Sequence, residues 1–223
     1  MKRRDRPSPS RYDHATGIEG ETEPGSNGRV LRNLRSIKRK RDMDRAEYDA
    51  LLRAYEDSLN NITAETRFTA AMLCAMHRSW LSDIYEWAGH YRTVDMSKGG
   101  FQFPPAHMVE ANMATFEAVT LREHTPCTAA GLPTVTRHIA RVHAELLLIH
   151  PFREGNGRLA RWLSDLMALQ AGLPVPDYGF TGRGSSTQRT RYLTAVMRSY
   201  VQDYNLLEAF FAAVIERRLE ALT

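Results

Sequence analysis

Apolar residues recur at helical spacing through most of the chain from Asp44 onward, and this periodicity predicts an assembly of packed helices. The clearest stripe lies over about 64–87 and includes Phe68, Met76, Trp80 and Ile84. Such a stripe is typical of a helix face that packs into a core. The predicted fold class is therefore mostly α. Further helices are expected from Asp44, over about 107–122, 134–149 and 157–171, and near 187–200 and 203–221.

Residues 90–104 interrupt the helical pattern. Two short β-prone segments, 91–96 and 101–103, lie on either side of Gly99-Gly100, and Pro104-Pro105 follows. Gly-Gly between such segments predicts a β-hairpin. A lone hairpin in a helical protein has no large sheet to join, so we expect it to have a docking role.

The composition is that of an ordinary globular protein. The chain has 223 residues, of which 43% are hydrophobic and 25% charged, so it can form a core without a disulfide or metal staple. Cys74 and Cys127 are too few for a disulfide framework. No apolar stretch reaches the roughly 18 residues of a membrane-spanning helix, and none follows the basic N-terminus as a signal peptide requires. These features predict a cytoplasmic protein with no membrane partner.

The N-terminal part differs from the rest. Residues 1–28 are rich in Pro, Gly, Ser and charge, which predicts a disordered tail before a single domain over 29–221. Eight Lys or Arg residues lie between Arg29 and Arg45, a segment that we call the basic arm. A basic run can bind nucleic acid. We favour a solvated face, because no aromatic residues interleave for base stacking and the net charge is only +4.

Residues 150–161, HPFREGNGRLAR, gather several kinds of chemistry into one loop and helix start. His150 follows an apolar helix, and an imidazole can take a proton near neutral pH. Glu154 is a hard oxygen ligand suited to Mg²⁺ on phosphates. Glycines beside a helix N-terminus let backbone N–H groups approach an anion. Arg158 and Arg161 share a helical face and can grip phosphate oxygens.

Each feature has an ordinary structural explanation when taken alone. A histidine at a helix end is more often structural, Gly-Asn-Gly is commonly a turn, and two arginines can form a solvated helix face. Their combination at fixed spacing favours a nucleoside-triphosphate site with a base for a hydroxyl nucleophile. Catalysis there would rest on positioning and charge stabilisation.

Residues 150–161, the signature loop, resemble without departure the signature of the Fic family, His-x-Phe-x-Asp/Glu-Gly-Asn-Gly-Arg-x-x-Arg. Residues 30–34 with 41–44 resemble the segment that leads into many bacterial Fic domains. Residues 87–89, with the hairpin over 97–101, resemble the family's flap. The resemblance covers about residues 29–215. It implies a Fic-type helical bundle with a small β-hairpin flap, about 90–104, beside the active-site loop.

The resemblance implies an enzyme, a protein adenylyltransferase, that transfers AMP from ATP to a Ser, Thr or Tyr hydroxyl of a target protein. His150 would deprotonate that hydroxyl, and Glu154 would hold Mg²⁺ between the α- and β-phosphates. Arg158 would bind the β/γ end and Arg161 the γ-phosphate, while Phe152 would anchor the loop. The implied nucleotide-binding set is Phe152, Gly155, Asn156, Gly157, Arg158 and Arg161.

The family's flap implies how a target would dock. It would align the target segment by strand addition, which fixes backbone register with little side-chain selectivity. The implied docking residues are Lys98, Gly99, Gly100, Phe101, Gln102 and Phe103. Relatives that phosphorylate their targets typically carry lysine in place of Gly157, so Gly157 favours AMP transfer. Transfer of another phosphate-linked group, such as phosphocholine, stays open.

Other candidate residues are less specific. His143 lies seven residues before His150 and five after His138, and neither spacing matches a zinc pair at i, i+4. We therefore expect His143 to be packed or to lie behind the active residues. Tyr91 and Tyr178 are candidates for a position near the adenine.

The family also implies a form of regulation. Fic enzymes are commonly silenced by a helix with Ser/Thr-x-x-x-Glu-Gly/Asn, whose glutamate pairs with the second signature arginine, here Arg161. Of the 15 glutamates, only Glu86 has Ser or Thr four residues earlier, and Trp87 stands where Gly or Asn is required. The sequence therefore predicts a bacterial toxin restrained by a separate small helical antitoxin that supplies the glutamate. The alternative class is an interaction module that is non-catalytic or binds nucleic acid, using the basic arm.

Overall fold

The computed structural model describes residues 18–128 and 131–223 and confirms a mostly helical fold with a small sheet. Its longer helices are α1 (Lys40–Asn61), α2 (Ala70–Leu81), α5 (Leu132–Ile149), α6 (Asn156–Gln170), α7 (Ser185–Ser199) and α8 (Asn205–Glu220). Its shorter helical segments are η1 (Ile18–Gly20), η2 (Ala106–Met108), α3 (Val109–Phe116), the π-helical turn η3 (Glu117–Leu121) and α4 (Arg122–His124). No helix in the described ranges has the length and apolar character needed to cross a membrane.

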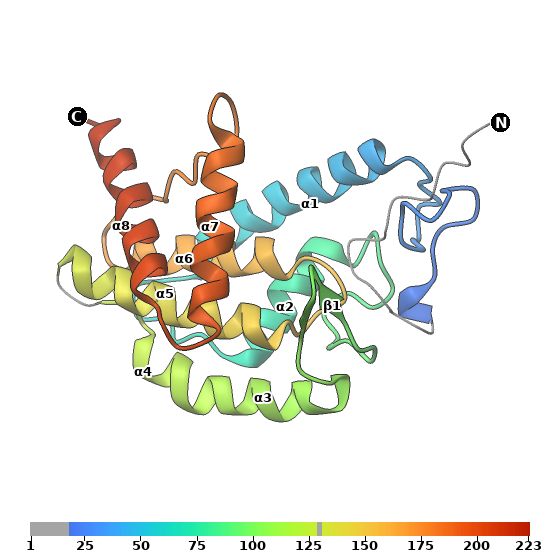
Figure 1. Ribbon diagram of the computed structural model, residues 1–223, viewed down its shortest axis with the longest axis horizontal. Helices are drawn as coiled ribbons and strands as arrows, with labels where there is room; N and C mark the ends of the chain where they lie inside the picture. The colour runs from blue at the N-terminus through green and yellow to red at the C-terminus, as the bar shows by residue number, and fades with distance from the viewer. Residues whose placement is uncertain (1–17, 129–130) are drawn as a thin grey trace.

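Helix α5 lies at the centre of the bundle, where it packs against α6 and α8 (Figure 1). Its residues Ile139, Val142 and Leu146 are almost completely buried, as their helical spacing predicts. Helix α7 packs on α8, and α1 packs on α2. Because α5 and α6 pack against each other, the loop that joins them, residues 150–155, is held against the core.

Helix α1 begins four residues earlier than the sequence predicts. Asp44 does not cap it; Asp44 lies inside the helix and forms an ion pair with Lys40. Tyr48 is 58% exposed on this helix. The buried face instead includes Met43 and Glu47. A glutamate at a core position is costly unless its carboxylate has partners, so the hydrophobic pattern alone could not identify this face.

Helix α2 is shorter than the predicted 64–87. Thr69 caps its start by accepting a hydrogen bond from the backbone N–H of Met72. After Leu81 the chain leaves the helix in tight turns that run to Gly89. The apolar stripe nevertheless lies in the core, with Trp80 and Ile84 at most 1% exposed. The periodicity predicted burial correctly but not the helix end, because turns can continue a buried stripe.

The predicted hairpin is present and shorter than the segment 90–104. Strand β1 (Ser97–Lys98) pairs antiparallel with β2 (Phe101–Gln102), with Ser97 opposite Gln102. Both turn residues, Gly99 and Gly100, have positive φ, at 56° and 81°. A two-residue hairpin loop of this type requires positive φ at both positions, which explains the Gly-Gly pair.

The N-terminal segment differs from its prediction where the structure describes it. Residues 18–28 belong to the predicted disordered tail, but they pack on the domain; residues 1–17 lie outside the described residues. Thr22 and Leu31 form an isolated β-bridge, and the carboxylate of Glu23 accepts a hydrogen bond from the backbone N–H of Asn33. Backbone pairing and buried polar contacts therefore order a segment that is poor in large apolar residues.

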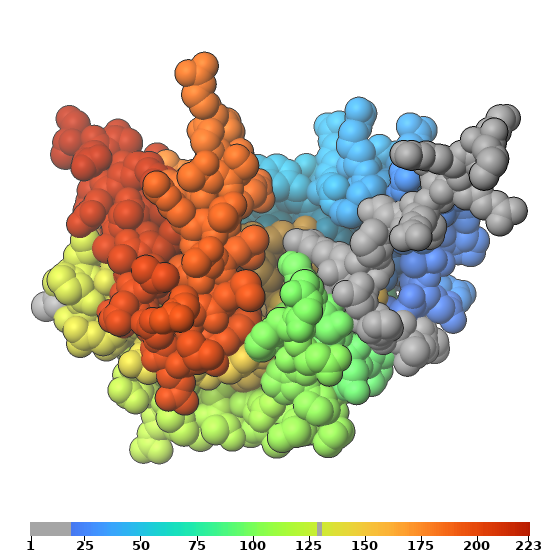
Figure 2. Space-filling model, in the orientation of Figure 1, coloured from blue at the N-terminus to red at the C-terminus, as the bar shows by residue number. Residues whose placement is uncertain are grey.

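The molecule is hollowed on one face. Figure 2 shows the hollow between α7 and α1, with atoms of α6 visible in it and the hairpin below. The last residues of the signature loop, 156–161, form the start of α6. Arg158 and Arg161 therefore lie on the helix that is visible in this hollow.

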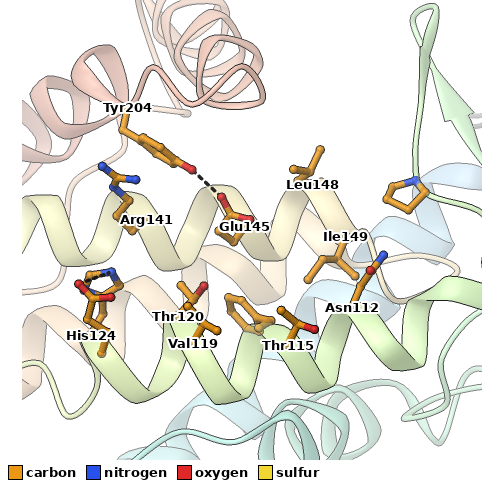
Figure 3. Close-up of a pocket in the computed structure, with 13 residues that line it drawn as sticks. Asn112, Thr115, Val119, Thr120, His124, Arg141, Glu145, Leu148, Ile149 and Tyr204 are labelled. Atoms are coloured by element: carbon orange, nitrogen blue, oxygen red, sulfur yellow. Dashed lines mark hydrogen bonds and ion pairs between the residues drawn. The ribbon is translucent and has the colours of Figure 1, made fainter.

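A separate groove of about 450 Å³ lies between α3 with η3 and helix α5 (Figure 3). Glu145 lies in it and accepts a 2.5 Å hydrogen bond from the hydroxyl of Tyr204. No residue of the signature loop lines this groove. This groove is therefore distinct from the site at the signature loop.

Candidate active site

His150 ends helix α5 in a backbone conformation that is rare for a non-glycine residue. Its φ and ψ are 52° and 57°, in the left-handed region. Its backbone N–H donates to the carbonyl of Leu146, and its ring stacks on Phe103 with centroids 3.8 Å apart. Strained residues of this kind cluster at functional sites, because surrounding contacts must hold them.

The imidazole of His150 is buried and neutral. Its Nδ1 lies 3.1 Å from the carbonyl oxygen of Leu147, so Nδ1 carries the proton and Nε2 is the basic nitrogen. Burial lowers the pKa of His150 from 6.5 to about 3, since the charged form would lose its hydration. At neutral pH the ring is therefore in the form that can accept a proton.

Arg92 fastens the His150 turn to the hairpin. It is 2% exposed. Its Nε donates to the carbonyl of His150 at 2.8 Å, and its two terminal nitrogens donate to the carbonyls of Val94 and Pro104. These carbonyls lie just before and just after the hairpin, so one guanidinium fixes the hairpin relative to His150. The sequence does not predict this role, because an arginine near a hairpin carries no spacing signal.

His77 of α2 packs against the signature loop. Its ring stacks on that of Phe152, with centroids 4.0 Å apart and planes 8° apart. Its Nδ1 accepts from the backbone N–H of Gly89, so its Nε2 donates to the carbonyl of Glu154 at 3.0 Å. Burial lowers the pKa of His77 to about 4. Phe152 is 0% exposed and anchors the loop in the core.

Asn156 closes the loop with two hydrogen bonds to Phe152. Its side-chain oxygen accepts from the backbone N–H of Phe152 at 2.9 Å, and its amide nitrogen donates to the carbonyl of the same residue at 2.6 Å. Asn156 is 1% exposed and is the first residue of α6. The amide side chain thus holds the loop backbone closed through hydrogen bonds to the N–H and the carbonyl of Phe152.

Gly155 and Glu154 form the turn at the N-terminus of α6. Gly155 has a φ of 89°, and a Cβ atom there would lie 2.8 Å from the Trp80 ring. The carboxylate of Glu154 accepts from the backbone N–H of Gly155 at 2.9 Å and lies 3.3 Å from Arg158. Glu154 is 7% exposed, so it presents a nearly buried carboxylate beside a helix N-terminus.

Arg158 is held between two carboxylates and an aromatic ring. One terminal nitrogen donates to Glu47 of α1 at 2.7 Å, and the other lies 3.3 Å from Glu154. Its guanidinium carbon lies 4.6 Å from the centroid of the Trp80 ring. The sequence placed Arg158 on a helix face but did not identify Glu47 as its partner.

Arg161 lies among three aromatic rings. Its guanidinium carbon is 5.4–6.0 Å from the ring centroids of Tyr178, Phe180 and Tyr192. Tyr178, a sequence candidate for the adenine, therefore lies beside Arg161, and its hydroxyl donates to Asp165 at 2.8 Å. Gly157 is helical, and a Cβ there would lie 3.7 Å from Arg161.

His143 and Tyr91, also candidates from the sequence, pack in or against the core. His143 is completely buried and packed, as predicted, with hydrogen-bonding distances of 2.9 Å to Ser164 and to Tyr192. Tyr91 lies beside Phe152, with ring centroids 6.0 Å apart.

The hairpin presents both buried and exposed residues to its surroundings. Phe103 is buried against His150, and Phe101 contacts Tyr200, the residue that follows α7, with ring centroids 4.7 Å apart. Lys98, Gly99, Gly100 and Gln102 are exposed. The buried ring of Phe103 therefore couples the hairpin to the loop, the partly buried Phe101 couples it to Tyr200, and the tip faces outward.

Residues 67–168 match the model of the Fic/DOC family. The chain contains a Fic domain. Among known proteins it is 29% identical over 188 residues to the "Probable protein adenylyltransferase y4lH" of Sinorhizobium fredii, an alignment that covers 83% of this chain and 90% of the relative. It is 28% identical to the "Protein adenylyltransferase VbhT" of Bartonella schoenbuchensis, covering 92% of this chain and 41% of that protein.

Solved structures support the same fold. The BepC protein of Bartonella tribocorum, crystallised with bound AMPPNP, superimposes with a TM-score of 0.66 at 21% sequence identity. The alignment covers 82% of this chain and 91% of BepC. At this identity the likeness establishes the Fic fold of the chain.

Three buried residues outside the signature loop thus hold this Fic domain's loop in place, and the sequence predicts none of these roles. They are Glu47, His77 and Arg92, and their loop partners lie 111, 77 and 58 residues away in the sequence. Contacts at such separations leave no local pattern in a single sequence.

Proposed function

We propose that this Fic domain transfers AMP from ATP to a Ser, Thr or Tyr hydroxyl of a target protein. The observation that carries the proposal is the closed signature loop, which joins a neutral buried histidine to a helix N-terminus with two arginines. The names of the relatives, both protein adenylyltransferases, support it. The AMPPNP bound to BepC supports ATP as the substrate.

In the proposed reaction, the target hydroxyl oxygen bonds to the α-phosphorus as the bond from that phosphorus to pyrophosphate breaks. Nε2 of His150 takes the hydroxyl proton. The N-terminus of α6 and the guanidinium groups of Arg158 and Arg161 stabilise the charge that moves onto the pyrophosphate. Phe152 and Asn156 keep the loop closed while this happens.

Mg²⁺ would be held by Glu154 between the α- and β-phosphates, where it would neutralise phosphate charge. A single carboxylate fits this role, because nucleotide-bound Mg²⁺ takes most of its ligands from phosphates and water. The described residues contain no cluster of three or more His, Cys, Asp or Glu suited to a metal. A resident multi-carboxylate centre is therefore not part of the proposal.

ATP labelled at different phosphates tests the reaction type. We expect a lysate incubated with the chain to gain labelled protein from ATP labelled at the α-phosphate, and none from ATP labelled at the γ-phosphate. Label from the γ-phosphate alone would indicate phosphorylation, which the glycine at position 157 disfavours. Labelling by a phosphocholine donor instead would identify a different transferred group.

The basic arm gives little support to the nucleic-acid alternative. Within the part of the chain that the structure describes, five of its eight cationic residues form ion pairs with carboxylates: Arg32, Arg35, Arg39, Lys40 and Arg45. Ion-paired arginines release fewer counterions from phosphates on binding. Salt-sensitive DNA binding without protein labelling would nevertheless favour this alternative.

We also propose that a separate antitoxin restrains this enzyme in the cytoplasm. Within the described residues no carboxylate forms an ion pair with Arg161, and no Ser/Thr-x-x-x-Glu-Gly/Asn motif occurs in the sequence. A glutamate supplied in trans would compete with the γ-phosphate for this guanidinium. Expression of the chain alone should inhibit growth, and co-expression with its genomic neighbour should restore it. An inert chain that an internal glutamate substitution activates would contradict this proposal.

The first prediction concerns Arg158 and Glu154, which are proposed to bind the phosphates and Mg²⁺. Arg158→Ala and Glu154→Ala should each weaken ATP–Mg²⁺ binding by about 1.5–3 kcal/mol, because each removes charge-assisted contacts. Isothermal titration with ATP–Mg²⁺ measures the change. Arg198→Ala is the matched control, since it removes an ion-paired arginine on α7 outside the loop. Unchanged affinity and activity in both loop variants would refute the assignment.

The hairpin makes the second prediction. Phe101→Glu should lower the rate of protein labelling by up to about 100-fold, the cost of moving reacting groups by roughly 1 Å, and change ATP affinity much less. The reason is that a charge in the contact with Tyr200 would displace the hairpin from its place beside His150. Phe101→Leu, which stays apolar, is the control. Equal effects of Phe101→Glu on labelling and on ATP affinity would contradict a target-docking role.

A further inference from the structure

Glu47 is a buried carboxylate that reaches the signature loop from α1. It is 3% exposed. One of its oxygens accepts a 2.7 Å hydrogen bond from Arg158, and the other accepts a 2.6 Å hydrogen bond from the hydroxyl of Tyr85. Its backbone carbonyl accepts from the indole N–H of Trp80 at 2.8 Å. A buried charge is stable only when its lone pairs are satisfied, and here both oxygens have donors.

The same network surrounds the guanidinium of Arg158. The Trp80 ring lies 4.6 Å from the guanidinium carbon and also lies against Gly155 of the loop. Glu47 thus fixes one terminal nitrogen, and the ring limits the plane in which the group can lie. The side chain of Arg158 is still 20% exposed, so it also reaches the surface of the site.

The contact with Glu47 is compatible with phosphate binding. A guanidinium carries five N–H donors in a fixed fork. Glu47 and Glu154 accept from one terminal nitrogen each, which leaves further N–H groups for phosphate oxygens. Because the hydroxyl of Tyr85 donates to the other oxygen of Glu47, the carboxylate is held in place and in turn holds Arg158. Glu47 therefore supports Arg158 and does not compete with the phosphates for all of its N–H groups.

We propose that Glu47 is a positioning residue that orients Arg158 for the β- and γ-phosphates of the nucleotide. This inference rests on the proposed function, in which ATP is the substrate. Glu47 itself need not touch the nucleotide. Its effect should therefore appear in nucleotide binding and should depend on the presence of Arg158.

Glu47→Gln is the test variant, because an amide keeps the shape but cannot accept from both Tyr85 and Arg158. We expect it to raise the Kd and the KM for ATP about 10- to 100-fold, as when a supporting partner of a binding group is lost. The KM for the target protein should not change. Glu145→Gln is the matched control, since Glu145 also accepts from a tyrosine hydroxyl but lines the groove away from the loop (Figure 3). A structural defect would move thermal stability and both KM values together.

A double-mutant cycle gives the decisive result. In an Arg158→Ala background, Glu47→Gln should change ATP affinity by less than about twofold, because the group it positions is gone. Independent effects, unchanged ATP affinity in Glu47→Gln, or increased affinity would each overturn the inference. If Glu47→Gln does not fold, Tyr85→Phe removes the second support of the carboxylate and should raise the KM for ATP in the same direction. A wild-type chain that neither binds ATP nor transfers AMP would instead refute the proposed function.

Discussion

His150→Ala is expected to lower the rate of AMP transfer by about 10²–10⁴-fold, the usual contribution of a general base, and to leave ATP affinity nearly unchanged. The imidazole serves the target hydroxyl, whereas the arginines and Glu154 serve the phosphates. Transfer from ATP labelled at the α-phosphate, measured at saturating ATP, gives the rate, and equilibrium titration gives the affinity. His107→Ala, an exposed histidine of η2, is the control. Near-normal turnover of His150→Ala would refute the role of this residue.

The pH dependence of the wild-type rate provides an independent check. Burial lowers the pKa of His150 to about 3, so the neutral form that accepts a proton persists as the pH falls below the ordinary value of 6.5. The rate should therefore stay level between about pH 8 and pH 6 and decline only as the pH approaches the lowered pKa. A decline centred near pH 6.5 would mean that the imidazole is exposed to water during the reaction.

The parts of the fold that were predicted correctly are those with strong local patterns. Helices α5 and α6 begin and end within two residues of their predicted bounds, because each carries a regular apolar face and α6 ends before Gly172. The hairpin followed from Gly99-Gly100, whose positive φ values few other residues adopt readily. In both cases the sequence within one short window contains the physical cause.

The parts of the fold that the sequence does not predict depend on distant contacts. The buried face of α1 contains Glu47, and its burial depends on Tyr85 and Arg158, which lie 38 and 111 residues away. Residues 18–28 pack on the domain through contacts such as that of Glu19, whose carbonyl accepts from Arg153. A polar segment that is ordered by another part of the chain looks the same in sequence as one that is not.

The signature loop illustrates both situations. Its residue types and spacing predict a nucleotide site, and the structure joins Phe152 and Asn156 by two hydrogen bonds that close the loop. The residues that hold the loop could not be predicted, because His77 and Arg92 act through backbone carbonyls. Any residue type offers a carbonyl, so such contacts leave no mark on the loop sequence itself.

Gly155→Ala is expected to lower the free energy of unfolding by about 2–5 kcal/mol. A left-handed backbone costs a non-glycine residue about 1–2 kcal/mol, and overpacking costs about 1–3 kcal/mol more. Gly155 has a φ of 89°, and the added Cβ would lie 2.8 Å from the Trp80 ring. Because that ring also lies beside the guanidinium of Arg158, the variant should weaken ATP binding as well. Urea unfolding and titration with ATP–Mg²⁺ measure the two effects.

Gly157→Ala is the matched control for stability, two residues further along the same loop. Gly157 lies within α6, and an added Cβ would come no closer than 3.7 Å to Arg161, an ordinary contact. Alanine at a helical position should therefore raise the free energy of unfolding by about 0.5–1 kcal/mol. The two substitutions add the same methyl group but should shift stability in opposite directions. Equal effects would mean that the turn at Gly155 relaxes away from Trp80, and that the ring does not hold the loop.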